Sequence, residues 1–365
     1  MTDLNRLVEI LENKRALPKQ WAQTVGAVDR ALFIPAQCPD IDRVTDEQKW
    51  LRTVYGDLPV VTQVDDGNGG GPGVPTSSSS QPSLMLDMLG LLEVEEGHRV
   101  LEIGTATGYH AAWLCHQLGD ANVTTVEVDS ELHHQARRNL QKAGYTPTMV
   151  FGDGLLGHAA GGPYDRIIAT CTLRAIPPAL LEQTANGGRI VAPFGSSFHS
   201  YSFLTLDVLD GTGQGRFSGR PAFMWARPHR GRTATIADVY HQEEGEKGST
   251  DIDPRALDAS PDAMFFLSLL VRDAWPVMRW ADDGSDEATY WLLSDDRQSW
   301  ATVEYVPGHD EFETDQYGPR RLWDEVEAAY RYWTRLESPK RERFGLTATA
   351  EGHSVWLDAP SNSVR

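Results

Sequence analysis

The sequence predicts an α/β fold followed by a C-terminal α+β extension. Between residues 80 and 230, apolar strand-like segments alternate with helical ones, which is the pattern of a parallel sheet covered by helices. One of these strands runs into a glycine-rich turn and then a helix, which is typical of a Rossmann-like domain. Beyond residue 230 lie seven of the eleven tryptophans, a density that indicates an ordered second unit rather than a tail.

We expect two domains, one over residues 1–230 and a tryptophan-rich extension over 231–365. The first begins with a helical part over residues 1–75, whose end, 65–75, is rich in Gly, Asn and Pro and predicts a loop. Residues 229–254 are polar and predict a linker. In the extension, the patterns predict strands over 288–293, 300–306 and 344–357 and a helix over 321–336.

Composition and charge narrow the classes of partner. The 33 basic and 52 acidic residues give a net charge of −19, which disfavours a nucleic-acid partner because phosphate backbones would be repelled. No apolar stretch reaches 18 residues and the N-terminus lacks the layout of a secretory signal, so we expect no membrane partner. Three scattered cysteines without a CxxC or Cys/His cluster favour a reducing cytoplasm and predict no metal site.

A glycine-rich turn gives the strongest functional signal. Residues 99–108 read RVLEIGTATG, a short apolar strand followed by a turn with Gly104 and Gly108, and a helix is predicted over 109–118. Glycines allow backbone amides to approach a ligand closely. The turn does not match the G-x-G-x-x-G pattern, which argues against a nicotinamide cofactor.

The following segments carry acidic groups at the ends of predicted strands. Glu127 ends the strand over 123–128, about 20 residues after the turn, where a carboxylate can accept hydrogen bonds from ribose hydroxyls. A helix over 131–143 and a strand over 148–151 lead to Asp153, which is placed to hold an adenine amino group. The predicted cofactor-binding residues are Glu102, Gly104, Thr105, Thr107, Gly108, Tyr109, Glu127, Val128, Gly152, Asp153 and Gly154. The alternative is a Rossmann-type domain that has lost its ligand.

The sequence Leu-Glu-Ile-Gly-x-x-x-Gly resembles motif I of class I methyltransferases, which implies S-adenosylmethionine (SAM) as cofactor and S-adenosylhomocysteine (SAH) as product. Over about residues 20–225 the chain further resembles protein-L-isoaspartate O-methyltransferases. The matching segments are 28–35 (VDRALFIP), 77–82 (SSSSQP), 152–154 (GDG), 163–165 (PYD), 176–183 (IPPALLEQ), 187–188 (GG) and 191–195 (VAPFG). The resemblance places Ser80 on the family's active-site serine.

The four-serine run and the long extension, which the repair enzymes of that family are expected to lack, depart from the family pattern. They resemble a narrower group, the methyltransferases that accompany ATP-grasp ligases in making crosslinked ribosomal peptides (graspetides). The features that match this group are residues 75–85, 169–171, 318–323, 344–347 and 355–357. This resemblance implies a precursor peptide as partner, methylation of one of its aspartates and collapse of the ester to a succinimide.

The implied chemistry requires little from the protein, because a carboxylate is already ionised near neutral pH and attacks the methyl group in line. Ser80 would orient the carboxylate. The predicted substrate-binding residues are Ser78, Ser79, Ser80, Gln81, Thr170, Cys171 and His199.

Several of these residues have a structural alternative. Residues 68–82 match a flexible Gly/Ser linker, and Ser80 is also a candidate N-cap of a helix over 84–92. Cys171 is also expected as a small buried residue, and His199 as an ordinary strand-surface residue. The tryptophans of the extension form either its core or a peptide-recognition surface.

Two rival functions remain open at this stage. One is the repair of isoaspartate in damaged proteins by the same methyl transfer. The other is a module that binds the cofactor or a peptide without catalysis, and a small-molecule methyltransferase is a more distant alternative. Binding and turnover of SAM separate the catalytic functions from the binding module.

Overall fold

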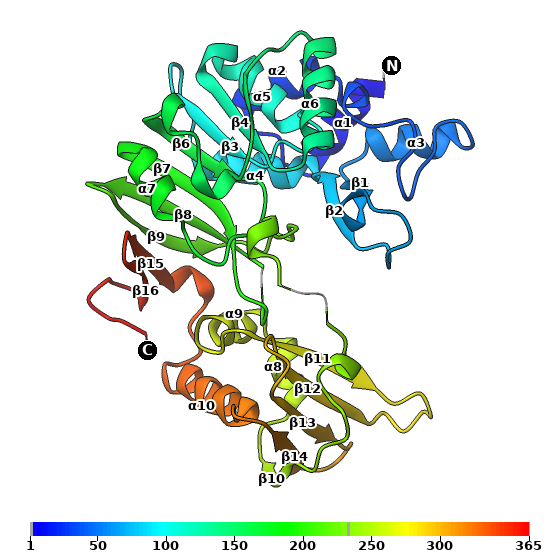
Figure 1. Ribbon diagram of the computed structural model, residues 1–365, viewed down its shortest axis with the longest axis vertical. Helices are drawn as coiled ribbons and strands as arrows, with labels where there is room; N and C mark the ends of the chain where they lie inside the picture. The colour runs from blue at the N-terminus through cyan, green and yellow to red at the C-terminus, as the bar shows by residue number, and fades with distance from the viewer. Residues whose placement is uncertain (1–2, 200, 232–233, 365) are drawn as a thin grey trace.

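A computed structural model describes residues 3–199, 201–231 and 234–364. A nine-stranded sheet forms its centre (Figure 1). Its strands, in spatial order, are β16 (Gly352–Leu357), β15 (Phe344–Thr349), β9 (Thr212–Ser218), β8 (Ser202–Leu209), β7 (Thr184–Phe194), β6 (Tyr164–Ala169), β3 (Val100–Ile103), β4 (Val123–Glu127) and β5 (Thr148–Phe151). Strands β5, β4, β3, β6 and β7 run parallel, and the rest pair antiparallel. The predicted α/β class with a Rossmann-like parallel core is confirmed.

Helices cover both faces of this sheet. They are α1 (Asp3–Asn13), α2 (Lys19–Ala27), α4 (Pro82–Leu92), α5 (Tyr109–Leu118), α6 (Ser130–Ala143) and α7 (Pro178–Gln183). Helix α3 (Glu47–Val54) lies apart from this sheet and packs in a smaller cluster with Ile34 and Val60. Apolar side chains of α1, α2, α4 and α5 form one core with residues of the parallel strands, such as Val100 and Ile168. Helix α7 packs on the opposite face, where Leu180 is fully buried.

The predicted loop over residues 65–75 is present, but it joins two strands that the sequence analysis missed. Strands β1 (Val60–Val64) and β2 (Pro75–Ser79) pair antiparallel beside the main sheet. The serine run therefore forms most of a strand rather than a flexible linker. This strand could not be predicted because its segment is rich in serine and glycine and lacks an apolar strand pattern. Its stability comes from pairing with β1 and not from its own apolar residues.

The extension contains a second sheet of five antiparallel strands. Its strands, in spatial order, are β10 (Glu246–Thr250), β14 (Phe312–Tyr317), β13 (Trp300–Tyr305), β12 (Ala288–Ser294) and β11 (Ala274–Trp280), and its helices are α8 (Pro254–Ala259), α9 (Pro261–Leu270) and α10 (Leu322–Arg335). The residues expected to be linker thus include β10, which pairs with β14. The paired residues of β10 and β14 lie more than 60 positions apart in the sequence, so the polar residues of β10 gave no sign of this pairing.

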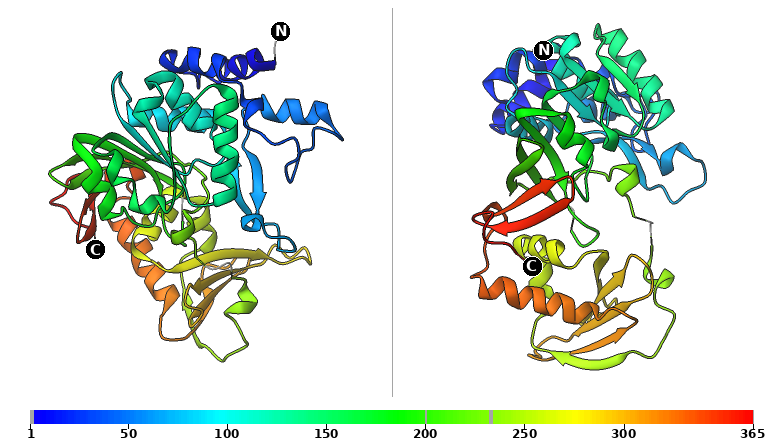
Figure 2. Two further views of the ribbon diagram at one scale, coloured as in Figure 1. Left: turned by 45° about the horizontal axis from the view of Figure 1, so that its top comes forward. Right: turned by 60° about the vertical axis from the view of Figure 1, so that its left-hand side comes forward.

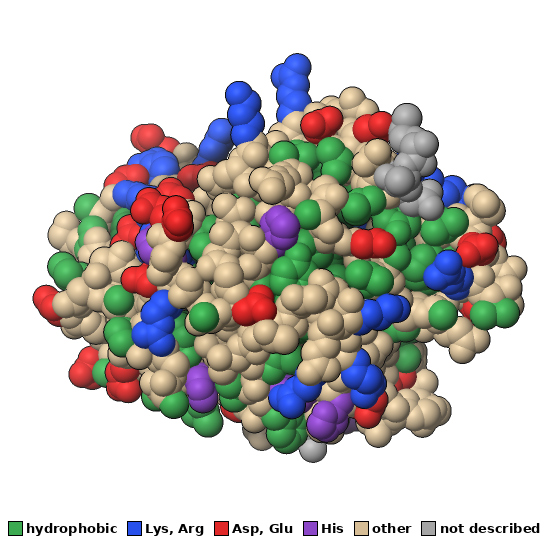
Figure 3. All heavy atoms as spheres, turned by 90° about the horizontal axis from the view of Figure 1, so that it is seen from above, with side chains coloured by type: hydrophobic (Ala, Val, Ile, Leu, Met, Phe, Trp, Pro, Cys, Tyr) green, Lys and Arg blue, Asp and Glu red, His purple; other side chains and the backbone are tan. Residues whose placement is uncertain are grey.

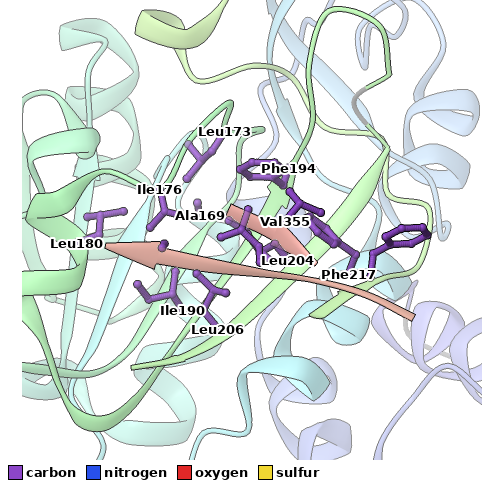
Figure 4. Packing of buried hydrophobic residues seen from close by; sticks show 14 of the residues in the cluster. Ala169, Leu173, Ile176, Leu180, Ile190, Phe194, Leu204, Leu206, Phe217 and Val355 are labelled. Carbon is purple, nitrogen blue, oxygen red and sulfur yellow. The ribbon is translucent and has the colours of Figure 1, made fainter. Parts of the chain in front are cut away.

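The last strands of the extension return to the main sheet. Strand β15 pairs with β9, and Val355 of β16 packs among Leu204, Phe194 and other residues of the main core (Figure 4). Figure 2 shows this hairpin beside β8 and β9, with α10 leading to it. The domain boundary predicted at residue 230 therefore does not separate the two sheets, because strands beyond it belong to the main sheet. The division into two functional units stays a prediction.

Helix α9 connects the two sheets because it is apolar on all sides. Phe265 and Phe266 face the main core, whereas Met264 and Leu267 belong to the core of the extension. On the face shown in Figure 3, acidic and basic groups are interspersed with apolar ones. Among the described residues, no helix is long and apolar enough to cross a membrane.

Candidate active site

A cavity of about 540 Å³ lies where the parallel strands end, between the glycine-rich turn and the serine strand. Its walls come from the turn after β3, the first turn of α5, the ends of β4 and β6, strand β2 with the start of α4, and residues 220–227. This is the position at which ligands bind in open α/β sheets, outside the carboxyl ends of the strands.

The glycine-rich turn has the shape that its sequence requires. Gly104 has φ of 95°, and a Cβ there would lie 2.7 Å from Thr170 Oγ1. Gly108 has φ of 87° and precedes α5 as its N-cap. Both positions favour glycine because an L side chain is strained at such φ values. The turn thereby exposes its backbone to the cavity, which is a cradle suited to a ligand such as SAM.

Glu127 occupies the position expected for a ribose-binding carboxylate. Its side chain lines the cavity, and its two oxygens accept hydrogen bonds from the backbone N–H groups of Ala106 (2.8 Å) and Asp129 (3.0 Å). Burial raises the pKa of Glu127, and these hydrogen bonds act in the opposite direction. Each oxygen keeps further acceptor capacity for a ligand hydroxyl.

Five of the predicted cofactor residues do not line the cavity. Glu102 is fully buried behind it and accepts hydrogen bonds from Thr125. Gly108 shapes the turn, and Asp153 caps a short helical turn by accepting from Leu155. The other two are Gly152 and Gly154. The six that line the cavity are Gly104, Thr105, Thr107, Tyr109, Glu127 and Val128. Cofactor contact by any of the eleven residues stays a prediction.

The serine strand forms the opposite wall. Ser78, Ser79, Ser80 and Gln81 all line the cavity, together with Thr170 and Cys171 from the end of β6. Burial raises the pKa of Cys171 to about 12, so its thiol is neutral near pH 7 and is no nucleophile. His199 lies outside the cavity wall, where its ring packs against Tyr201 at 5.0 Å. Burial and the charges of Arg341 and Arg220 lower the pKa of His199 to about 4.

The expected N-cap role of Ser80 is wrong. Helix α4 begins after Gln81, with Pro82 in its first turn, and the carboxylate of Asp57 accepts from the Ser83 N–H at 2.8 Å. Asp57 comes from a loop more than 20 positions away, so the local sequence could not reveal this cap. The Ser80 hydroxyl makes no hydrogen bond with another described residue and is thus available to a ligand.

A buried arginine that the sequence analysis did not single out supports the serine strand. Arg30 is 0% exposed and donates to the carbonyl oxygens of Ser79 (3.1 Å) and Ser80 (3.0 Å), as well as to the hydroxyl of Ser79. It also donates to backbone carbonyls of residues 54, 56 and 58. Burial lowers the pKa of Arg30 to about 10, so it remains charged. The only sequence signal was its place in the segment 28–35.

The third wall was also missed, because it comes from a segment without a motif. Met224, Trp225 and Arg227 lie among residues 220–227 that border the cavity. The guanidinium of Arg227 forms ion pairs with Asp129 (2.6 Å) and Asp66 (3.3 Å). These contacts connect the end of β4 with the loop after β1 across the third wall.

Comparisons with known proteins agree with this geometry. The family model described as Protein-L-isoaspartate(D-aspartate) O-methyltransferase (PCMT) matches residues 2–209, more than half of the chain.

The chain belongs to this family.

It is therefore a SAM-dependent carboxyl O-methyltransferase. Similar proteins include the protein-L-isoaspartate O-methyltransferase 2 of Polaromonas sp., 36% identical over 58% of this chain and 90% of that protein. The enzyme of Methanothrix thermoacetophila is 36% identical over 52% of this chain and 80% of its own length.

A solved structure named protein-L-isoaspartate O-methyltransferase aligns over 98% of this chain and 100% of its own, with a TM-score of 0.57 and 21% identity. This likeness concerns the fold alone. It nevertheless corrects the expectation that the extension separates this chain from proteins with that name, because the aligned region includes the extension.

Proposed function

We propose that this methyltransferase esterifies an aspartate side chain in a ribosomal peptide that an ATP-grasp ligase has crosslinked. The observation that supports this best is the placement of two segments that resemble the graspetide group. Residues 75–85 and 169–171 are far apart in sequence, yet residues of both line one cavity. The features at 318–323, 344–347 and 355–357 lie elsewhere and add no residue to the cavity.

The cavity supplies what the reaction requires of a protein. When bound, SAM supplies an activated methyl group to a carboxylate oxygen, so the enzyme needs to position the reactants and exclude water. The Ser80 hydroxyl would orient the carboxylate, with Ser78 and Gln81 beside it. In the methylated peptide, the next backbone nitrogen attacks the ester carbonyl, methanol leaves and a succinimide remains.

Repair of isoaspartate is the second candidate. It is favoured by the names of the similar proteins and by the solved structure that aligns with the extension as well. Both functions use the same bond changes at the same cavity. They differ in the peptide that the enzyme accepts.

Intact mass spectrometry separates the two. The enzyme is incubated with SAM and, in parallel, with an isoaspartyl peptide, a linear precursor peptide and its crosslinked form. We expect only the crosslinked peptide to gain a methyl group and then lose methanol, for a net loss of one water. Methylation of the isoaspartyl peptide alone would establish the repair function instead. Binding of SAM without methylation of any peptide would contradict both.

A further inference from the structure

His110 lies in the first turn of α5 and lines the cavity, although neither motif nor resemblance drew attention to it. Its side chain is only 8% exposed. Ring atom Nδ1 lies 2.6 Å from Glu102 Oε1, whereas Nε2 is buried and has no hydrogen-bond partner among the described residues. A buried polar atom without a partner is costly, so Nε2 indicates a missing ligand group.

The hydrogen bonds behind the ring determine what Nε2 can do. Glu102 is 0% exposed, and its other oxygen accepts from Thr125 Oγ1 at 2.6 Å. The hydroxyl of Thr105 lies 2.6 Å from that of Thr125 and completes the chain. An ionised Glu102 can only accept, so Nδ1–H of His110 donates to it; a ring with a single proton then holds that proton at Nδ1 and presents a lone pair at Nε2.

The Glu102 carboxylate also has no permanent cation as a partner. Among residues 3–199, 201–231 and 234–364, no lysine or arginine forms an ion pair with it, and its contact with His110 is an ion pair only when that ring is protonated. A buried carboxylate without a cation is unfavourable. A cationic hydrogen-bond donor in the cavity would satisfy both Nε2 and this negative charge.

We propose that His110, oriented by Glu102, accepts a hydrogen bond from the α-ammonium group of SAM. Glu102 stands two residues before Gly104, and His110 stands two residues after Gly108, so the two side chains bracket the turn. His110 is therefore a cofactor-positioning residue, and Glu102 acts through it rather than on the ligand. The inference does not depend on which peptide is methylated.

Isothermal titration calorimetry with SAH tests this without turnover. His110→Asn keeps a donor near Glu102 but removes the acceptor in the cavity, and we expect it to weaken SAH binding about 10- to 100-fold. His110→Gln places a side-chain carbonyl near the former Nε2, so it should lose less affinity. A merely structural role predicts the reverse order, because Asn retains the Glu102 contact. His116→Asn, on the same helix, should bind SAH like the wild type, since His116 contacts Tyr145 outside the cavity.

An SAH analogue without the α-amino group identifies the ligand atom. It should bind the wild type and His110→Asn with equal affinity, because the group that His110 recognises is absent. The same Kd for SAH in folded His110→Asn and wild type would overturn the proposal. The proposal would also be overturned if the analogue without the α-amino group bound the wild type more tightly than His110→Asn. If His110→Asn does not fold, His110→Ala, which also lacks the acceptor at Nε2, is compared with both ligands by the same criteria. Failure to methylate any peptide would contradict the proposed function but leave these Kd values to decide the role of His110.

Discussion

Ser80 combines a fixed backbone with a free hydroxyl. The Ser80 carbonyl accepts a hydrogen bond from Arg30 at 3.0 Å, which holds the backbone in place. The Ser80 hydroxyl forms no hydrogen bond with another described residue. Ser79, its neighbour, differs because its hydroxyl accepts from Arg30. This contrast is a physical reason to prefer Ser80 to Ser79 for the orienting role.

Replacing Ser80 with alanine should lower kcat/KM for the accepted peptide about 10- to 100-fold, because one hydrogen bond to a charged group is lost. Thermal stability should stay unchanged. Steady-state kinetics and a melting curve check both expectations. Ser354→Ala, at an exposed position of β16, is the matched control. Full activity of Ser80→Ala would remove that hydroxyl from the mechanism.

Asp129 gives a pH-dependent prediction. Burial alone would raise its pKa, but hydrogen bonds from the Leu132 backbone, Gln63 and Arg227 outweigh it and hold the pKa at about 2. A depressed folded-state pKa stabilises the protein above the unfolded value of about 3.9, and this contribution is lost as pH falls to about 2. Asp129→Asn should therefore be less stable than wild type at pH 7, with a difference that shrinks between about pH 4 and pH 2. Urea unfolding at several pH values measures it, and a difference independent of pH would contradict the account.

At the scale of elements, the helices and strands that could be predicted are those whose own residues show a clear pattern. The boundaries of α5 and β5 match the sequence prediction, because each is a short apolar segment bounded by turn residues. Strands β2 and β10 were missed because each is polar and depends on a partner strand. For the same reason, the turn and the serine segment of the cavity were identified from motifs, whereas Arg30 and residues 220–227 reach it only through tertiary folding.

Arg30 holds η1 (Arg30–Leu32), the loop after α3 and strand β2 together. Arg30→Met should lower the free energy of unfolding by at least about 3 kcal/mol, because several buried carbonyl groups lose their donor. The measurement is urea denaturation. Arg138→Met removes an arginine that is 66% exposed and should change stability by less than about 0.5 kcal/mol. Equal stabilities of the two variants would contradict the supporting role of Arg30.

At the scale of the whole molecule, the chain leaves the main sheet and returns to it. Strand β15 extends the sheet through β9, and α9 contributes to both cores. Neither feature could be predicted from the tryptophan-rich composition of the extension, which suggested a separate unit. The consequence is that the two sheets should unfold together.

Phe344 tests this coupling. It is 0% exposed and packs against Phe265 and Phe266 at ring-centroid distances of 5.8 and 5.3 Å. Phe344→Ala should cost about 3–5 kcal/mol, the usual range for a buried aromatic residue. Differential scanning calorimetry should show one transition, shifted to lower temperature, whereas Leu209→Ala, 63% exposed, should leave it in place. Two separate transitions, with only one shifted, would show that the sheets unfold independently.

A crystal structure of the complex with SAH would test this arrangement of the active site most directly. We expect SAH in the cavity, with its ribose hydroxyls on Glu127, its amino group on His110 Nε2 and its sulfur facing Ser80 across the cavity. A ligand bound elsewhere, or one whose sulfur faces away from the serine strand, would contradict it.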